Sequence, residues 1–139
     1  MTWLHWALLS AGFAGVTAVL AKAGTRDIEP NLATAIRTTV VLVLSWGIVF
    51  ANGVPALAAV TGRGLWFLIF SGVATGLSWL CYFRALHLGE ASVVAPVDKL
   101  SVIFAIALAA IFLGEEVTWR HWVGGGLIVT GAVVIALKP

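Results

Sequence analysis

The chain has 139 residues, of which 61% are apolar or aromatic and only 10% are charged. A soluble domain carries roughly 25% charged residues, so this composition cannot supply the polar surface that a soluble domain of this length needs. The net charge of +2 is too small and too dispersed for a nucleic-acid-binding surface. The composition excludes a soluble enzyme, a nucleic-acid binder and a disordered segment, and it predicts an integral membrane protein.

The charged residues divide the chain into apolar stretches of the length that transmembrane helices require. A spanning helix needs about 20 mostly apolar residues to cross a hydrocarbon core of ~30 Å. The stretches are continuously apolar, not alternating, which favours helices over a barrel. The predicted spans are residues 3–21, 32–51, 65–83, 91–113 and 122–137. The predicted fold class is therefore all-α, with five transmembrane helices in a single domain over residues 1–139.

The predicted connections are short and carry helix breakers. They are residues 22–31, 52–64, a tight turn at 87–90, and 114–121. Residues 21–23 have the A-x-A form of a signal-peptide cleavage site, but no basic segment precedes the first apolar run. We therefore expect the first span to be a retained helix.

The orientation is encoded only by a small excess of basic residues. The face that holds the C-terminus carries Lys22, Arg26, Arg84 and Lys138, and the other face carries Arg63 and Arg120. The positive-inside rule then predicts a cytoplasmic C-terminus, and the narrow margin is compatible with insertion in both orientations. We expect the protein in the cytoplasmic membrane of a prokaryote.

The aromatic residues are distributed unevenly between the two faces. Six of the seven tryptophans fall towards the N-terminal face, as an interfacial belt would: Trp3, Trp6, Trp46, Trp66, Trp119 and Trp122. Trp79 and Tyr82 lie towards the other face and are candidate site residues.

Three ionisable residues fall inside predicted spans, namely Arg37, Asp98 and Lys99. A charge near the bilayer centre costs at least ~2.5–3.5 kcal/mol, so each one requires a partner or a function. At 1.5 Å per residue, all three lie within about 7 Å of the middle of their spans and share one level. Two interpretations stay open. Arg37 and Asp98 form an ion pair that only joins two helices, or at least one of the three residues belongs to a site that binds substrate or a coupling ion. Adjacent helical residues point about 100° apart, so we expect Asp98 and Lys99 not to pair with each other.

Pro96 lies beside this charged level. A proline inside a helix removes one backbone hydrogen bond and kinks the helix. Backbone groups freed within the membrane must face protein or a water-filled cavity. The sequence thus predicts a kinked, solvated central site at Pro96.

The remaining patterns indicate packing and no chemistry. Glycines spaced four or seven residues apart are typical of close helix packing, within or between chains: Gly72, Gly76, Gly124 and Gly131. His5, His87 and His121 are scattered at the interfaces without metal-ligand spacing. With one cysteine, Cys81, and no nucleophile–base arrangement, we expect no cofactor, no metal site and no enzymatic activity.

The second half of the chain carries four short motifs: Tyr82-Phe83-Arg84-Ala85-Leu86, Ser92-Val93-Val94-Ala95-Pro96, Leu113-Gly114-Glu115 and Trp122-Val123-Gly124. Together they resemble the EamA domain of the drug/metabolite transporter superfamily. In the first half, Lys22 and Arg37 stand where the family has a lysine at the end of helix one and an arginine in helix two. The Asp98-Lys99 pair is not part of the general signature.

The resemblance implies an architecture and an activity. Most family members resemble two five-helix units fused in inverted orientation, and this chain corresponds to one unit. An odd number of spans inverts the second unit of a fused pair, and a lone unit lacks that second half, so the resemblance implies an inverted, antiparallel homodimer in the lipid bilayer. The implied activity is secondary transport of a small organic metabolite by efflux or exchange, with Arg37 and the Pro96 region lining the central cavity.

Three functions remain open from the residues. A proton-coupled transporter of an anionic or zwitterionic solute fits a level whose net charge is +1, with Asp98 as the carboxylate that could carry a proton. Multidrug efflux of lipophilic cations is disfavoured by that positive charge. A membrane accessory subunit would use the charges only for helix packing.

Overall fold

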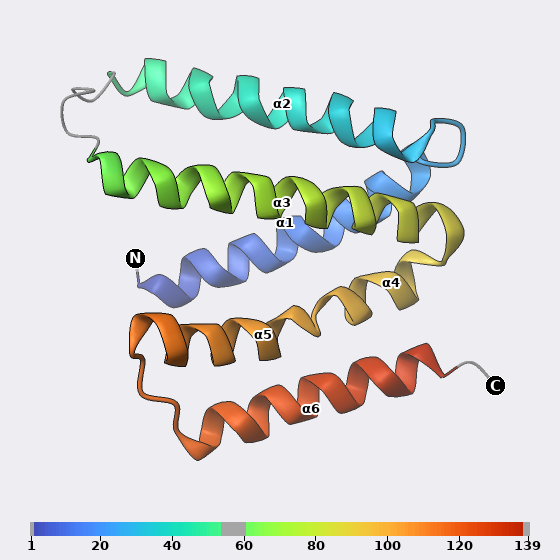
Figure 1. The fold of residues 1–139 in the computed structure, drawn as a ribbon. Helices are drawn as coiled ribbons and strands as arrows, with labels where there is room; N and C mark the ends of the chain where they lie inside the picture. The colour runs from blue at the N-terminus through green and yellow to red at the C-terminus, as the bar shows by residue number, and fades with distance from the viewer. Residues whose placement is uncertain (1, 54–60, 138–139) are drawn as a thin grey trace. The chain divides into compact units, whose positions relative to one another are not determined.

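The computed structural model describes residues 2–53 and 61–137. Within these residues the chain is helical and has no strand. In chain order the elements are α1 (Trp3–Gly24), α2 (Pro30–Ala51), α3 (Gly62–Leu88), α4 (Ala91–Asp98), α5 (Ser101–Leu108), the π-helical turn η2 (Ala109–Leu113) and α6 (Trp119–Ala136) (Figure 1). The all-α prediction is confirmed for the described part of the chain.

Four helical stretches are long and apolar enough to cross a membrane. They are Trp3–Gly24, Pro30–Ala51, Gly62–Leu88 and Ala91–Leu113, and they match the first four predicted spans. The fifth predicted span, 122–137, coincides with α6, which begins with the polar sequence Trp119-Arg120-His121. These residues shorten its apolar part, so its crossing of the bilayer stays a prediction.

The predicted connections were too long. α1 continues through Lys22 to Gly24, and α2 begins at Pro30, so the first connection is only residues 25–29. Likewise α3 begins at Gly62 and α6 at Trp119, each three residues before the predicted start. Charged and aromatic residues at span ends were assigned to loops, whereas long side chains can reach polar surroundings from within a helix. Within the predicted loop 52–64, residues 54–60 lie outside the described part.

The chain divides into two compact units. We call residues 1–20 and 88–139 the terminal unit, and residues 21–87 the middle unit. In the terminal unit, α6 packs against α4 and α5. The middle unit holds α2, α3 and the last turn of α1.

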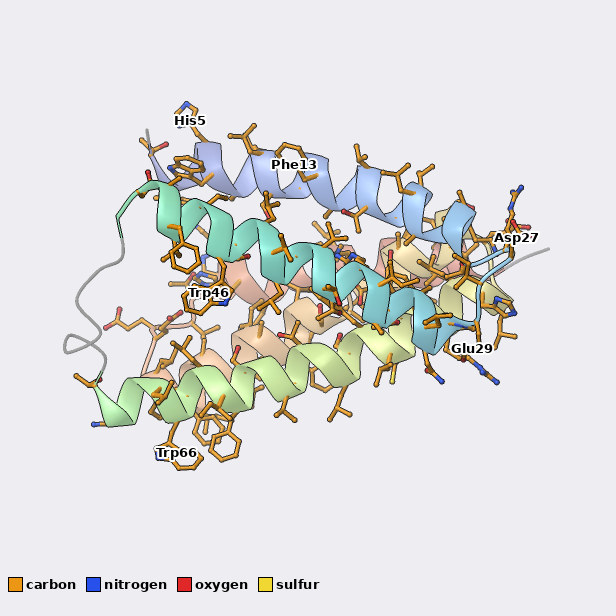
Figure 2. The ribbon with its side chains drawn as sticks, turned by 90° about the horizontal axis from the view of Figure 1, so that it is seen from above. His5, Phe13, Asp27, Glu29, Trp46 and Trp66 are labelled. Atoms are coloured by element: carbon orange, nitrogen blue, oxygen red, sulfur yellow. The ribbon has the colours of Figure 1, made fainter. Side chains whose placement is uncertain are left out.

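Little of the apolar surface is buried within the chain. The buried apolar residues are Ala18, Ala21, Ala33, Phe83, Leu86 and Ala132. Large side chains such as Phe13 on α1 and Trp66 on α3 are 71% and 61% exposed, and Figure 2 shows both standing out from their helices. A soluble monomer rarely exposes apolar surface of this extent, so these faces are suited to contact with lipid.

The fourth predicted span is interrupted next to its proline. α4 ends at Asp98 and α5 begins at Ser101. Across the break, the backbone N–H groups of Lys99 and Leu100 donate to the carbonyls three residues earlier, both at 3.0 Å. The interruption follows Pro96 by two residues, and Lys99 and Leu100 keep right-handed helical backbone angles (φ −71°, ψ −6° and φ −58°, ψ −22°). The fourth span is therefore interrupted by a short turn of tighter hydrogen bonds beside Pro96, and a kink of the helix axis there stays a prediction.

Close packing in the terminal unit occurs at a glycine that spacing did not single out. A Cβ on Gly125 would stand 2.8 Å from Cδ1 of Ile103 and 3.4 Å from Cδ1 of Ile106, both on α5. By contrast, a Cβ on any of the four predicted packing glycines would meet no described atom of its own unit within 4 Å: Gly72, Gly76, Gly124 and Gly131. A packing role for those four between chains stays a prediction.

Replacing Gly125 with valine should loosen the contact between α5 and α6. Overfilling a packed contact destabilises it, and part of the strain is relieved because the contacted Cδ1 atoms end isoleucine side chains that can shift, so we expect a Tm slightly below that of the control in detergent micelles. Gly126→Val is the matched control, because a Cβ there meets no described atom within 4 Å. Equal Tm values for the two variants would contradict the observed packing.

Candidate functional site

The middle unit holds a cation stacked on an aromatic side chain. Cζ of Arg37 on α2 lies 4.1 Å from the ring centroid of Trp79 on α3, and 5.6 Å from that of Phe83. Trp79 and Phe83 are four residues apart, so they share one face of α3. Arg37 and Trp79 are half-buried and Phe83 is only 2% exposed. The structure therefore brings together two predicted site residues and adds Phe83.

The stacking fixes how Arg37 can be used. A guanidinium lying on a tryptophan face gains about 0.5–2 kcal/mol from the ring quadrupole and keeps its N–H donors in the plane of the group. Within the middle unit, no described carboxylate forms an ion pair with Arg37. These donors match the two oxygens of a carboxylate or a phosphate.

Tyr82 adjoins this cluster. Its ring meets that of Phe83 edge-on, with centroids 6.4 Å apart, and the side chain is half-buried. The predicted residues Arg37, Trp79 and Tyr82 therefore belong to one half-buried region of α2 and α3.

Asp98 and Lys99 form an ion pair in the terminal unit. Nζ of Lys99 lies 3.1 Å from Oδ2 of Asp98, with side-chain exposures of 59% and 36%. The expectation that these neighbours do not pair was wrong. It assumed a continuous helix, but α4 ends at Asp98 and Lys99 is its C-cap, which lets the long lysine side chain fold back. Arg37 lies in the other unit, so an Arg37–Asp98 pair stays a prediction.

Two reciprocal hydrogen bonds join the ends of α1 and α3 in the middle unit. Nζ of Lys22 donates to the carbonyl of Leu86 at 2.7 Å, and Nδ1 of His87 lies 2.7 Å from the carbonyl oxygen of Thr25. Leu86 and Thr25 are almost fully buried. Lys22 satisfies one of the last carbonyls of α3, which have no partner within the helix. From the sequence, Lys22 and His87 were expected in connections at the membrane interface, and these two hydrogen bonds were not predicted.

Glu29 caps the start of α2 outside the membrane-spanning segments. Its Oε2 accepts the backbone N–H of Leu32 at 2.9 Å. The backbone N–H groups of Leu32 and Asn31 lower the pKa of Glu29, and the attraction of Arg84 and His87 adds to this effect.

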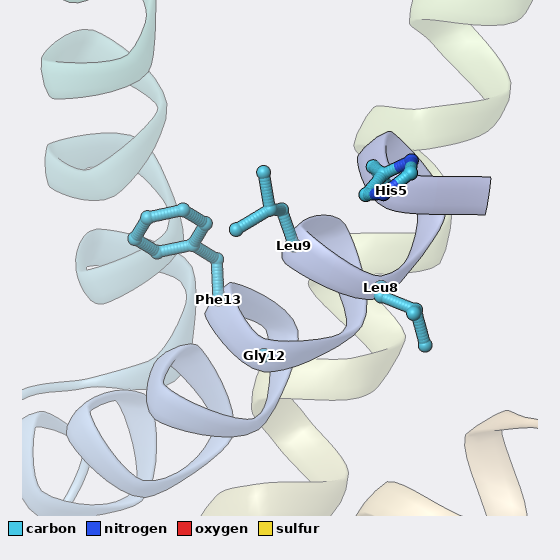
Figure 3. A pocket seen from close by; sticks show the side chains of 5 residues that line it. All are labelled: His5, Leu8, Leu9, Gly12 and Phe13. Carbon is cyan, nitrogen blue, oxygen red and sulfur yellow. The ribbon is translucent and has the colours of Figure 1, made fainter. Parts of the chain in front are cut away.

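The described residues contain two open apolar grooves. One, of about 560 Å³, follows α1 along His5, Leu8, Leu9, Gly12 and Phe13 (Figure 3). The other, of about 310 Å³, follows α2 and is lined by Thr38, Val41, Leu42, Ser45, Trp46 and Val49. None of the predicted site residues lines either groove. No group of three potential metal ligands occurs in residues 2–53 and 61–137.

The family model described as "EamA-like transporter family" matches residues 1–137. The chain belongs to this family. The resemblance inferred from the sequence is therefore confirmed, and the membrane-spanning helices are those of an EamA-like transporter.

Related proteins carry transporter names. The chain is 47% identical to an uncharacterized transporter in the cobO 3′ region of Sinorhizobium sp, over 98% of this chain and 97% of that protein. It is 40% identical to a probable terminal-alkyne amino-acid exporter of Streptantibioticus cattleyicolor, over 46% of this chain and 22% of that protein. It is 31% identical to a probable 4-amino-4-deoxy-L-arabinose-phosphoundecaprenol flippase subunit, ArnE, of Yersinia pseudotuberculosis, over 50% of this chain and 60% of that protein. No solved structure matches the chain.

The start of α2 in this EamA-like chain should fray on acidification. Because the pKa of Glu29 is lowered in the folded protein, its capping contribution is present above the ordinary glutamate value of about 4.3 and is lost as pH falls through the lowered value. The exchange rate of the Leu32 amide, corrected for intrinsic pH dependence, should therefore rise as the pH falls below the ordinary glutamate value and through the lowered pKa of Glu29.

Glu29→Gln is the control, because the amide oxygen can still accept the hydrogen bond but does not titrate. The corrected exchange rate should be independent of pH in that variant. A wild-type Leu32 amide whose exchange ignores acidification would show that the carboxylate does not hold this helix start.

Proposed function

We propose that this EamA-family transporter moves a small anionic or zwitterionic metabolite across the cytoplasmic membrane by proton-coupled efflux or exchange. The observation that carries the proposal is the Arg37 guanidinium stacked at 4.1 Å on Trp79, inside a helix apolar enough to span the bilayer. Because no described carboxylate of the middle unit pairs with this intramembrane guanidinium, the guanidinium is suited to bind an anionic solute.

The substrate class follows from the chemistry of Arg37. A guanidinium presents parallel N–H donors that bind a carboxylate in bidentate fashion. A lipophilic cation would be repelled by the same group, which disfavours multidrug efflux. The name of the Streptantibioticus relative, an amino-acid exporter, supports a solute that carries a carboxylate.

Asp98 and Lys99 supply the coupling step in this proposal. In the ionised state Asp98 neutralises Lys99 at 3.1 Å. Protonation of Asp98 removes that partner and leaves Lys99 with an unbalanced positive charge that attracts an anionic solute. Loss of the proton restores the ion pair and favours release, so the solute and the proton move in the same direction and the solute gradient drives efflux. The pair lies at the short turn between α4 and α5, two residues after Pro96.

The proposed transporter is an antiparallel homodimer. An odd number of spans inverts the second unit of a fused pair, which provides the two-fold relation that alternating access uses. Two separate copies have the same relation when they insert in opposite orientations. The similarity to the Sinorhizobium transporter covers 97% of that relative, so a single unit of this size occurs in the family. The weak basic asymmetry between the two faces supports insertion in both orientations.

Asp98→Asn should abolish proton coupling. In proteoliposomes loaded with a pH-sensitive dye, a panel of amino acids and short carboxylic acids should drive proton flux through the wild type. The variant keeps the side-chain shape but cannot exchange a proton, so solute-driven acidification should disappear. Glu116→Gln, an exposed carboxylate outside the described helices, is the control and should behave like the wild type. Undiminished proton flux in Asp98→Asn would remove Asp98 from the mechanism.

Trp79→Leu should raise KM for the solute that gives the largest flux. Loss of the stacking energy of about 0.5–2 kcal/mol predicts an increase of about 2- to 30-fold, with kcat less affected because Trp79 positions Arg37. Trp79→Phe should recover part of the affinity. Trp66→Leu, which changes a more exposed tryptophan of the same helix, is the control. Equal KM values for Trp79→Leu and Trp66→Leu would argue against Arg37 as the solute-binding group.

A further inference from the structure

The first and last helices begin with the same short sequence. Thr2-Trp3-Leu4-His5-Trp6 opens α1, and Thr118-Trp119-Arg120-His121-Trp122 opens α6. Both share the pattern Thr-Trp-x-His-Trp. Both lie in the terminal unit, so the same local structure can be compared at two places.

The two helix starts also share one hydrogen-bond geometry. At α1, Nδ1 of His5 lies 3.3 Å from the backbone N of Thr2 and 2.8 Å from its hydroxyl oxygen. At α6, Nδ1 of His121 lies 3.0 Å from the backbone N of Thr118 and 2.9 Å from its hydroxyl oxygen. Each histidine thus occupies the third helical position, where a capping box usually has glutamate or glutamine.

This geometry determines the protonation state of both rings. A backbone N–H can only donate, so Nδ1 of His5 and His121 must be the unprotonated acceptor and the ring proton must be on Nε2. Uptake of a further proton can then occur only at Nδ1. That proton would remove the acceptor and place a positive charge at the positive end of the helix dipole. The hydrogen bond from the threonine backbone N–H to the imidazole, one half of each cap, therefore exists only while its histidine is neutral.

His87 has the opposite arrangement. Its Nδ1 lies 2.7 Å from the carbonyl oxygen of Thr25, and a carbonyl can only accept, so Nδ1 carries the proton. A second proton would go to Nε2 and leave this hydrogen bond in place. The third histidine is therefore a natural control for the other two.

We propose that His5 and His121 are a matched pair of proton-binding groups whose protonation weakens the caps of α1 and α6. The inference does not depend on the transported solute or on Asp98. It gives the chain a response to acidification at the amino-terminal ends of two helices.

The charges around these rings are few. Residues 3–20 of α1 carry no ionisable side chain other than His5. Near His121, the sequence places Arg120 beside it and Glu115 and Glu116 in the segment that leads to α6, and none of the three forms an ion pair with a described residue. Of the elements packed on α6, α5 has no ionisable residue and α4 contributes Asp98, which is paired with Lys99. The protonation of each ring is thus coupled mainly to its own cap.

The first test is the tautomeric state in the full chain. In lipid nanodiscs at pH 7.5, ¹⁵N NMR of the histidine side chains should give the Nε2–H tautomer for His5 and His121 and the Nδ1–H tautomer for His87. An Nδ1–H tautomer at His5 or His121 would overturn the proposal without any variant.

The second test is amide exchange at the two helix starts as the pH is lowered from 7.5 to 5.5. Corrected for intrinsic rates, exchange of the Thr118 and His121 amides, and of the Thr2 and His5 amides, should rise about 2- to 30-fold, the range expected for loss of a cap. An unchanged rate at either helix would contradict the paired response.

Glutamine variants identify the group that titrates. His5→Gln and His121→Gln keep an acceptor at the third helical position but cannot bind a proton in this range. Each should abolish the pH response of its own helix and leave that of the other. His87→Gln should leave both responses intact. Persistence of both responses in the His5→Gln/His121→Gln double variant would assign the effect to another group and overturn the proposal.

Discussion

A backbone polar group in hydrocarbon has no water to bind, and leaving it unpaired costs several kcal/mol. This constraint determines the form of the EamA-like chain. Where a helix ends or is interrupted, a side chain or a different backbone group forms the hydrogen bond that the helix no longer provides. Lys22 binds a terminal carbonyl of α3, and tighter backbone bonds bridge the break after Asp98. Within α2, the hydroxyls of Thr34 and Thr38 bond to carbonyls one turn earlier, each at 2.8 Å. In the described residues, no buried side-chain N or O atom lacks a partner.

The same constraint governs where the charges lie. Each intramembrane charge of the described helices has an identifiable companion, but the companions differ in kind. Arg37 lies on an aromatic face, which moderates the charge and leaves its hydrogen-bond donors available. Asp98 and Lys99 neutralise each other. A transporter needs a charged group with free hydrogen-bond donors, because a fully satisfied group cannot bind solute. It also needs its other membrane charges neutralised, because an isolated charge is costly. In the proposed function, Arg37 binds the solute and the Asp98–Lys99 pair couples transport to the proton.

The type of each element could be predicted from the sequence, because long apolar runs in a membrane must be helical. The residues at which the helices end could not be predicted. Lys22 was assigned to a loop because it is charged, but its backbone stays helical and its side chain donates to the carbonyl of Leu86. The pairing of Arg37 with Trp79 also exceeds what spacing can give, because no pattern within one helix tells which face meets a neighbour. The Asp98–Lys99 pair was wrongly excluded by ideal helix geometry at a place where Pro96 already indicated that this geometry fails. The histidine caps were missed because scattered histidines were compared with metal sites and not with helix starts.

The ion pair within the fourth span bears on how the chain enters the membrane during synthesis. A helix that carries Asp98 and Lys99 would present two separate charges to the lipid, each costing ~2.5–3.5 kcal/mol at the centre of the bilayer. Because the two groups are adjacent and in contact at 3.1 Å, they can enter as one neutral dipole. Insertion of this span then does not have to wait for Arg37 or for a second copy of the chain. Moving Asp98 and Lys99 apart along the sequence would therefore raise the free-energy cost of inserting this span, before it affected the assembled transporter.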